Sequence, residues 1–303
     1  MKIGIVAKPR LADVGDTLAA IEAWMTGHAI DAVWSPEAVA GLPDGPGGRV
    51  VVDREHLPEV VDLVLVLGGD GTLLAMADRI AAADRDIPIL GVNFGSLGFL
   101  TEITRPELFA SLDAIIDGRA THDERMMLQA VVGDAGDGPS TIRGATTADA
   151  ARGLIALNDV VFTRGPLSRM VEVSVWVGEQ FVTTVRADGL IVASPTGSTA
   201  YNLSAGGPIV HPAMDAMLIT PIAPHTLTNR PIVIPAEREV RVAPTAATAG
   251  DEMYVTVDGQ SGFPLPQGRS VTISRAPRPL RLVRASARSY FEVLRQKLRW
   301  NER

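Results

Sequence analysis

The sequence predicts two domains: an N-terminal doubly wound α/β domain, then an all-β, sandwich-like domain. Residues 61–67 form an apolar run that suits a strand covered on both faces of a parallel sheet. Strand and helix patterns alternate up to residue 117, which is typical of α/β domains. Beyond residue 118, apolar and polar residues alternate with the period of half-buried antiparallel strands. The length of 303 residues is sufficient for two domains.

The elements of the α/β domain are expected along residues 1–117. Apolar runs predict strands at 3–7, 30–34, 61–67 and 87–92. Apolar residues at helical spacing predict helices around 18–25, at 72–83 and at 105–117, the last with Pro106 in its first turn. The Pro- and Gly-rich stretch 36–48 is predicted to be a loop.

The β domain is expected along residues 118–285. Its predicted strands are 126–132, 154–162, 171–177, 181–186, 190–193, 240–243, 253–257 and 271–274. Residues 289–300 have the pattern of a final amphipathic helix, which we expect to pack back on the α/β domain.

Composition excludes several classes of function. The net charge of −7 argues against a general nucleic-acid binder, which needs a basic surface. The chain has no cysteine, which excludes disulfides, cysteine-ligated metals and thiol nucleophiles, and which fits a cytoplasmic protein. We also expect no membrane association, because the longest apolar stretch is far too short to span a bilayer. The five histidines lack the spacing of a zinc motif.

The first motif that suggests chemistry is Gly-Gly-Asp-Gly-Thr at residues 68–72, between a predicted strand and a predicted helix. Glycines let phosphate oxygens approach backbone N–H groups, and a helix N-terminus favours negative charge. Asp70 would repel phosphates unless it works on a metal or takes a proton from an attacking hydroxyl. The alternative is a plain glycine turn in which Asp70 is a helix N-cap.

The second motif is Ser-Pro-Thr-Gly-Ser-Thr-Ala-Tyr at residues 194–201, after a short apolar strand. Its hydroxyl groups can donate hydrogen bonds to a polar ligand, and Tyr201 offers a flat ring for a base. The alternative is a hairpin turn capped by Ser and Thr side chains. Asn158 and Asp159 are further candidates, because two adjacent polar residues are unfavourable in a strand unless they serve a ligand or a bulge.

Taken together and in this order, the motifs resemble the NAD kinase family. The matching segments are 68–72, 91–102, 158–159, 188–208, 224–231 and 258–260. The run at 68–72 is shared with diacylglycerol and sphingosine kinases, whereas the long segment 188–208 is much more selective. The family fold is an α/β domain followed by a β-sandwich domain, which agrees with the change of pattern near residue 118.

The resemblance implies transfer of the γ-phosphoryl group of ATP to the 2′-hydroxyl of the adenosine ribose of NAD, giving NADP. Asp70 would accept the proton of that hydroxyl, and Asn158 and Asp159 would hold ribose hydroxyls. The family usually has Asn-Glu where this chain has Asn-Asp, so the carboxylate of Asp159 reaches one methylene less far. The residues implied to bind substrate or nucleotide are Gly68, Gly69, Asp70, Gly71, Asn93, Asn158, Asp159, Arg169, Arg186, Asp188, Thr199, Ala200, Tyr201, Asn202, Leu203, Ser204 and Gln260.

The resemblance also implies a divalent cation, magnesium, which would accompany ATP and be held largely by its phosphates. No protein ligand for this metal is identified. Family members are commonly dimers or tetramers, so a homo-oligomer is expected. Two other functions stay open: a lipid kinase, which needs a membrane-binding face that the net charge does not support, and a non-catalytic dinucleotide sensor, which would be expected to have lost Asp70.

Overall fold

A computed structural model of the chain describes residues 1–11, 14–42, 48–134, 153–164, 170–226, 228–245, 253–285 and 288–300. The chain forms two compact units, Met1–Glu124 with Leu280–Arg303, and Arg125–Pro279. The first is an α/β unit and the second an all-β unit, so the predicted fold class is confirmed. The division falls later than residue 117, because β7 (Thr121–Arg125) and β20 (Leu280–Arg284) are strands of the α/β sheet.

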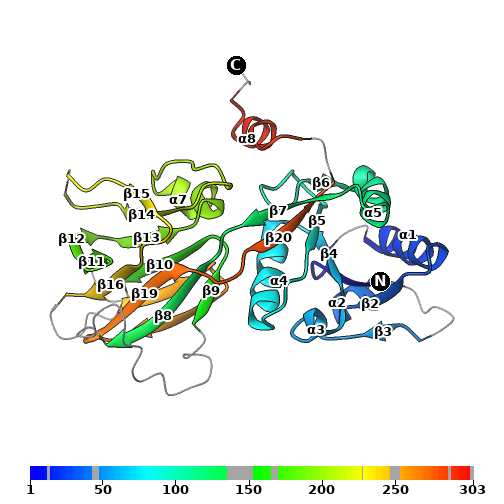
Figure 1. Ribbon diagram of the computed structural model, residues 1–303, viewed down its shortest axis with the longest axis horizontal. Helices are drawn as coiled ribbons and strands as arrows, with labels where there is room; N and C mark the ends of the chain where they lie inside the picture. The colour runs from blue at the N-terminus through cyan, green and yellow to red at the C-terminus, as the bar shows by residue number, and fades with distance from the viewer. Residues whose placement is uncertain are drawn as a thin grey trace. The chain divides into compact units, whose positions relative to one another are not determined.

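The α/β sheet has the strand order β3-β2-β1-β4-β5-β20-β7, with β6 beside β5. Besides β7 and β20, its strands are β1 (Lys2–Ala7), β2 (Asp31–Trp34), β3 (Val50–Val51), β4 (Leu63–Gly68), β5 (Ile89–Asn93) and β6 (Ile103–Thr104). β4 is buried at every position and pairs in parallel with both β1 and β5 (Figure 1). The continuous apolar run at 61–67 is thus a central strand, as predicted.

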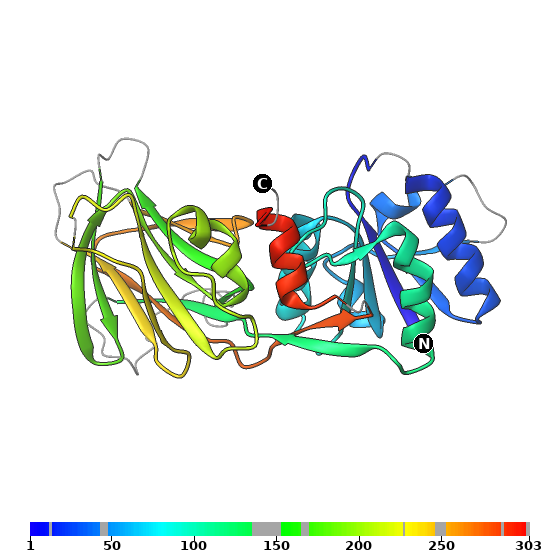
Figure 2. The ribbon, with the colours of Figure 1, turned by 90° about the horizontal axis from the view of Figure 1, so that it is seen from above.

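Helices cover both faces of this sheet. They are α1 (Val14–Gly27), α2 (Pro36–Val39), α3 (Leu57–Val60), α4 (Asp70–Ala82) and α5 (Leu108–Ile116), the last after a 3₁₀ turn at Arg105–Glu107. Leu65 of β4 packs in one core with Leu18 of α1 and Leu112 of α5. A Cβ on Gly91 of β5, facing the other way, would lie 2.7 Å from Leu73 of α4. Hence α1 and α5 cover one face and α4 the other (Figure 2).

Two features of this unit bear on the predictions. The loop expected at 36–48 begins instead with α2, because Ser35 caps the helix and Pro36 suits its first turn. The final helix α8 (Tyr290–Leu298) belongs to the α/β unit, as predicted. Arg288, just before it, forms an ion pair of 2.7 Å with Glu107.

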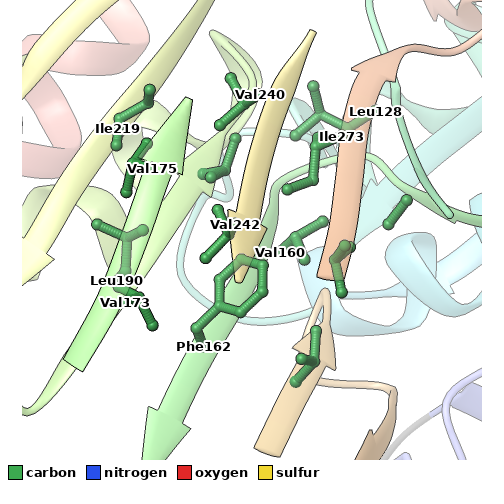
Figure 3. Close-up of a cluster of buried hydrophobic side chains, with 14 of the residues drawn as sticks. Leu128, Val160, Phe162, Val173, Val175, Leu190, Ile219, Val240, Val242 and Ile273 are labelled. Atoms are coloured by element: carbon green, nitrogen blue, oxygen red, sulfur yellow. The ribbon is translucent and has the colours of Figure 1, made fainter. Parts of the chain in front are cut away.

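The β-sandwich unit consists of two antiparallel sheets. One has the order β15 (Ile232–Pro235), β14 (Ala216–Ile222), β13 (Gly189–Ala193), β10 (Asp159–Arg164), β17 (Met253–Val257), β18 (Ser261–Leu265). The other has the order β12 (Gln180–Ala187), β11 (Val171–Val177), β16 (Val240–Pro244), β19 (Arg269–Arg275), β8 (Leu128–Asp134), β9 (Leu154–Ala156). Phe162 of one sheet and Val173 and Val242 of the other lie in the core between them (Figure 3).

The single strand predicted at 154–162 is wrong. β9 ends at Ala156 in one sheet and β10 begins at Asp159 in the other, so the chain crosses between sheets at Leu157 and Asn158. The polar pair Asn158-Asp159 therefore marks a crossing, which periodicity alone did not reveal. No helix among the described residues is long and apolar enough to cross a membrane.

Candidate functional site

The Gly-Gly-Asp-Gly-Thr motif lies where the strand order of the α/β sheet reverses. From β1 the chain runs outward to β2 and β3, and then returns to the other side of β1 as β4. Helix α1 follows β1 and helix α4 follows β4, and these two helices cover opposite faces of the sheet (Figure 2). In open α/β sheets ligands bind outside the carboxyl ends of the strands at such a point. The motif thus occupies the usual ligand position of this architecture.

The glycines of the motif leave its backbone accessible. A Cβ on Gly69 or on Gly71 would meet nothing within 4 Å, so these peptide groups are open to a ligand. A Cβ on Gly68 would lie 2.7 Å from Thr72 Oγ1 and 3.3 Å from Lys8 Cβ, so this position is crowded. Lys8 is exposed, and its Cβ lies next to Gly68 of the motif. Sequence reasoning missed Lys8, because only the pairing of β1 with β4 brings it here.

Asp70 is the first residue of α4 and Gly69 is the N-cap, so the alternative of Asp70 as N-cap is wrong. The Asp70 carboxylate instead accepts four hydrogen bonds from residues 99–101. Oδ2 accepts the N–H of Phe99 at 2.8 Å. Oδ1 accepts the N–H groups of Leu100 and Thr101 at 3.2 and 3.0 Å, and the Thr101 hydroxyl at 2.8 Å. We call residues 98–101 the Asp70 cradle.

The cradle depends on a glycine and an asparagine. A Cβ on Gly98 would lie 2.0 Å from Asp70 Oδ1, so only glycine fits there. Asn93 Nδ2 donates to the Thr101 hydroxyl at 2.9 Å and to the Ser96 carbonyl at 2.8 Å, so Asn93 holds this loop in place. Since Oδ2 has a single donor, it is the Asp70 oxygen that retains capacity to accept a substrate proton.

A second group of predicted residues lies in the β-sandwich unit, where the chain crosses between the sheets. Asp258 and Gly259 form the turn between β17 and β18, with φ of 51° and 63°. Gln260 N–H donates to the Val257 carbonyl at 2.9 Å, which completes a type I′ hairpin turn. The Asp258 carboxylate accepts three consecutive backbone N–H groups, those of Leu157, Asn158 and Asp159, at 2.7, 2.8 and 3.0 Å.

The same crossing is held from the opposite side by the second motif. Ser194 donates its N–H to the Asn158 carbonyl at 2.8 Å and its hydroxyl to the Leu157 carbonyl at 2.5 Å. A Cβ on Gly197 would lie 2.0 Å from the Asn158 carbonyl oxygen, so this position also requires glycine. The half-buried Asn158 side chain makes no hydrogen bond to the described part of the chain, which leaves its amide available to a ligand.

Asp159 is 5% exposed. Burial, and then the negative charge of Asp258, raise the pKa of Asp159 to about 7. Near neutral pH the group is therefore present both as a carboxylic acid and as a carboxylate, and can donate as well as accept a hydrogen bond.

The segment after Ser194 forms a 3₁₀ turn (Thr196–Thr199) and then the short helix α7 (Tyr201–Ser204), not the tight hairpin turn of the alternative interpretation. Tyr201 is 45% exposed and Ser204 is also exposed, whereas Thr199, Ala200 and Leu203 are partly buried. Asn202 is 0% exposed. Its amide donates to the carbonyls of Ser198 and Pro208 and accepts from the Thr220 hydroxyl, so in this structure Asn202 holds the turn together.

Of the remaining predicted residues, Arg186 and Asp188 lie apart from this crossing, Gln260 lies on the turn that holds it, and Arg169 lies outside the described residues. Arg186 is exposed and pairs with Glu172 at 2.7 Å, and Asp188 lies 3.7 Å from His225. Asp188 directly precedes β13 and Arg186 lies near the end of β12, so both are at the opposite end of β13 from Ser194, which is roughly 20 Å from Asp188 along the strand. Gln260 is exposed on the β17–β18 turn. In the described segments no three His, Asp or Glu side chains gather as a metal site.

Comparisons with known proteins agree with these features. Residues 49–120 match the ATP-NAD kinase N-terminal domain, and residues 157–285 match the ATP-NAD kinase C-terminal domain. The chain is 41% identical to the NAD kinase of Geotalea daltonii and 44% identical to that of Geobacter sulfurreducens, in each case over 100% of this chain and 99% of the relative.

Two solved structures share the fold. One is yeast NADH kinase complexed with NADH, with a TM-score of 0.80, 22% identity, and coverage of 100% of this chain and 88% of that one. The other is an NAD kinase from Archaeoglobus fulgidus in complex with ATP, with a TM-score of 0.73, 24% identity, and coverage of 99% of each chain. The full-length similarity to curated relatives and the two matching domains lead to one conclusion: this chain belongs to the NAD kinase family.

Proposed function

We propose that this chain is an NAD kinase that transfers the γ-phosphoryl group of ATP to the 2′-hydroxyl of the adenosine ribose of NAD. The observation that carries the proposal is the Asp70 carboxylate. It lies at the strand-order reversal of the α/β sheet, is fixed by four hydrogen bonds and keeps capacity on Oδ2. A fixed acceptor beside open glycine peptides suits phosphoryl transfer, in which positioning and electrostatics supply most of the catalysis.

In the proposed reaction, Asp70 Oδ2 accepts the proton of the 2′-hydroxyl. The hydroxyl oxygen forms a bond to the γ-phosphorus while the bond from that phosphorus to the β–γ bridging oxygen breaks, and ADP leaves. The open N–H groups near Gly69 and Gly71 and the Lys8 ammonium would bind phosphate oxygens. The cradle would keep the carboxylate from turning away as charge builds up.

The dinucleotide would be recognised in the β-sandwich unit. The Asn158 amide and the Asp159 carboxyl would bind ribose hydroxyls, and the exposed Tyr201 ring would pack on a base or ribose. Thr199, Ala200, Leu203 and Ser204 would line the same turn, with Asn202 supporting it from inside.

Magnesium remains part of the proposal as an ion carried by ATP. The open glycine peptides of the 68–72 motif suit phosphate oxygens, and these oxygens would in turn hold the ion. When bound, the ion would neutralise charge on the transferring phosphoryl group.

We propose a homo-oligomer, a dimer or a tetramer, because the residues predicted to bind the dinucleotide lie far apart within one β-sandwich unit. Arg186 and Asp188 lie at the far end of β13 from Asn158, so one β-sandwich unit does not gather all of them at one point. A second copy could supply this end to a neighbouring site, and sedimentation analysis would give the number of copies. We place the enzyme in the cytoplasm, which a chain without cysteine suits.

The direct test is incubation with ATP, magnesium and NAD, followed by detection of NADP. Parallel reactions replace ATP with polyphosphate, NAD with NADH, and NAD with diacylglycerol or sphingosine. We expect NADP formation that depends on donor and metal. Product only with the lipids would support the lipid kinase, and NAD binding without any product would support the sensor.

A further inference from the structure

Asp258 is a charged residue to which the proposed reaction assigns no role. It occupies the first central position of the β17–β18 turn in the left-handed region, with φ of 51°. Both Asp and Asn tolerate this conformation, so the turn alone does not require a carboxylate. Its negative charge therefore needs another explanation.

The carboxylate is placed where it fixes the backbone next to the substrate-binding side chains. It accepts the N–H groups of Leu157, Asn158 and Asp159 at 2.7, 2.8 and 3.0 Å. The carbonyls of Leu157 and Asn158 are held from the other side by Ser194. With both sides of these peptides bound, the direction of the Asn158 side chain depends on the Asp258 contacts.

Asp258 also sets the charge around Asp159. Asp159 lies on β10 between β13, whose residues Gly189–Ala193 are uncharged, and β17, whose titratable Tyr254 pairs with Thr163 further along β10. Asp258 directly follows β17, and it is the charged residue whose field acts on Asp159 within the described segments. Two carboxyl groups so placed resist simultaneous ionisation.

We propose that Asp258 is a positioning residue of the dinucleotide site: its carboxylate fixes the crossing at 157–159, and its negative charge favours the hydrogen-bond-donating form of the neighbouring Asp159. The proposal rests on dinucleotide binding by Asn158 and Asp159. A protonated Asp159 donates to a ribose oxygen and spares the pyrophosphate of NAD a second nearby negative charge.

The test is the pH dependence of NAD binding, measured by calorimetry without ATP from about pH 5.5 to about pH 8.5, a range that spans the Asp159 titration. The proteins compared are the wild type, Asp258→Asn, Asp159→Asn and the control Glu237→Gln. Asn keeps the turn and removes the charge. Glu237→Gln removes the same charge at an exposed position of the same unit.

We expect wild-type affinity for NAD to fall as the pH rises through about 7, where Asp159 ionises. In Asp258→Asn this fall should occur at a lower pH than in the wild type, because the neighbouring charge has gone while the burial of Asp159 remains. At acid pH the same variant should bind about tenfold more weakly, because an amide replaces one of the oxygens that accept the N–H groups. Asp159→Asn should bind independently of pH, and Glu237→Gln should match the wild type.

If Asp258→Asn binds NAD more weakly at every pH but its affinity falls at the same pH as in the wild type, the electrostatic role of Asp258 is overturned. Asp258 would then have a purely structural role. A flat wild-type profile would overturn the electrostatic role too. Thermal melts of the same proteins without nucleotide, recorded across the same pH range, give a second measurement. The pH at which the melting temperature falls should also be lower in Asp258→Asn. If no protein binds NAD at any pH, the proposed substrate fails, while the melts still decide the coupling between the two acids.

Discussion

Replacement of Asp70 by Asn tests both the proposed chemistry and the cradle around it. Asn keeps the size of the side chain but carries one oxygen and one NH₂ group. If the oxygen stays at the Oδ1 position with its three donors, the NH₂ group faces the Phe99 N–H, which then loses its acceptor. The remaining bonds also lose the strength that a charged acceptor provides. The expected loss of stability is about 2 kcal/mol, or roughly 4–8 °C in Tm.

The effect on turnover should be much larger than the effect on folding. Loss of a general base lowers kcat by about 10²–10⁴. Dinucleotide binding should be kept, because the residues proposed for it lie in the other unit. NADP formation, NAD binding and melting should be measured on one preparation, with kcat corrected for the folded fraction. Thr101→Val is the matched control, because it removes one donor to Asp70 and leaves the proton acceptor in place.

Two results would refute this reasoning. Near-normal kcat in Asp70→Asn would remove Asp70 from the chemistry, whatever its contacts. An unchanged Tm would instead show that the four hydrogen bonds do not hold the carboxylate in solution. If Thr101→Val lost as much activity as Asp70→Asn at equal stability, the proton acceptor would not be the feature that matters.

Three further outcomes are expected. Tyr201→Ala should raise KM for NAD by roughly tenfold with little change in kcat, because the exposed ring supplies about 0.5–1.5 kcal/mol beyond its buried area; collapsed kcat at constant KM would contradict this. Lys8→Met should raise KM for ATP and reduce its dependence on salt, and equal KM values at low salt would exclude a phosphate contact. The free energy of unfolding should fall by up to ~4 kcal/mol as pH rises from about 4 to about 7, and should then level off. The reason is that Asp159 holds its proton in this pH range when the chain is folded and loses it when the chain is unfolded. Chemical denaturation should show the loss in the wild type and not in Asp159→Asn.

Much of the fold could be predicted because single segments carried strong local patterns. The central strand β4 was predicted because it is apolar throughout, and β11 because buried valines alternate with more exposed residues along it. Pairing between distant segments has no such pattern. β20 joins the α/β sheet after an entire second unit, and β9 and β10 belong to different sheets although one continuous run connects them.

The candidate site divides in the same way. Asp70, Asn158 and Tyr201 were predicted as site residues because their residue types are unusual at their positions in the sequence. Thr101 and Asp258 were missed because their roles depend on atoms far along the chain: Thr101 bonds Asp70 across the cradle, and Asp258 reaches Leu157. An available signal for Asp258 was the Asp-Gly pair, the strongest short-range mark of a hairpin turn.

The position of β20 also sets the order in which the polypeptide can mature during synthesis. The α/β sheet includes a strand from each end of the chain, and the whole β-sandwich unit is translated between them. While the ribosome is still making that unit, β7 lacks its neighbour and the edge of β5 that receives β20 stays open. We therefore expect the β-sandwich unit, which is continuous in sequence, to become protease-resistant on the nascent chain before the unit that carries Asp70 does.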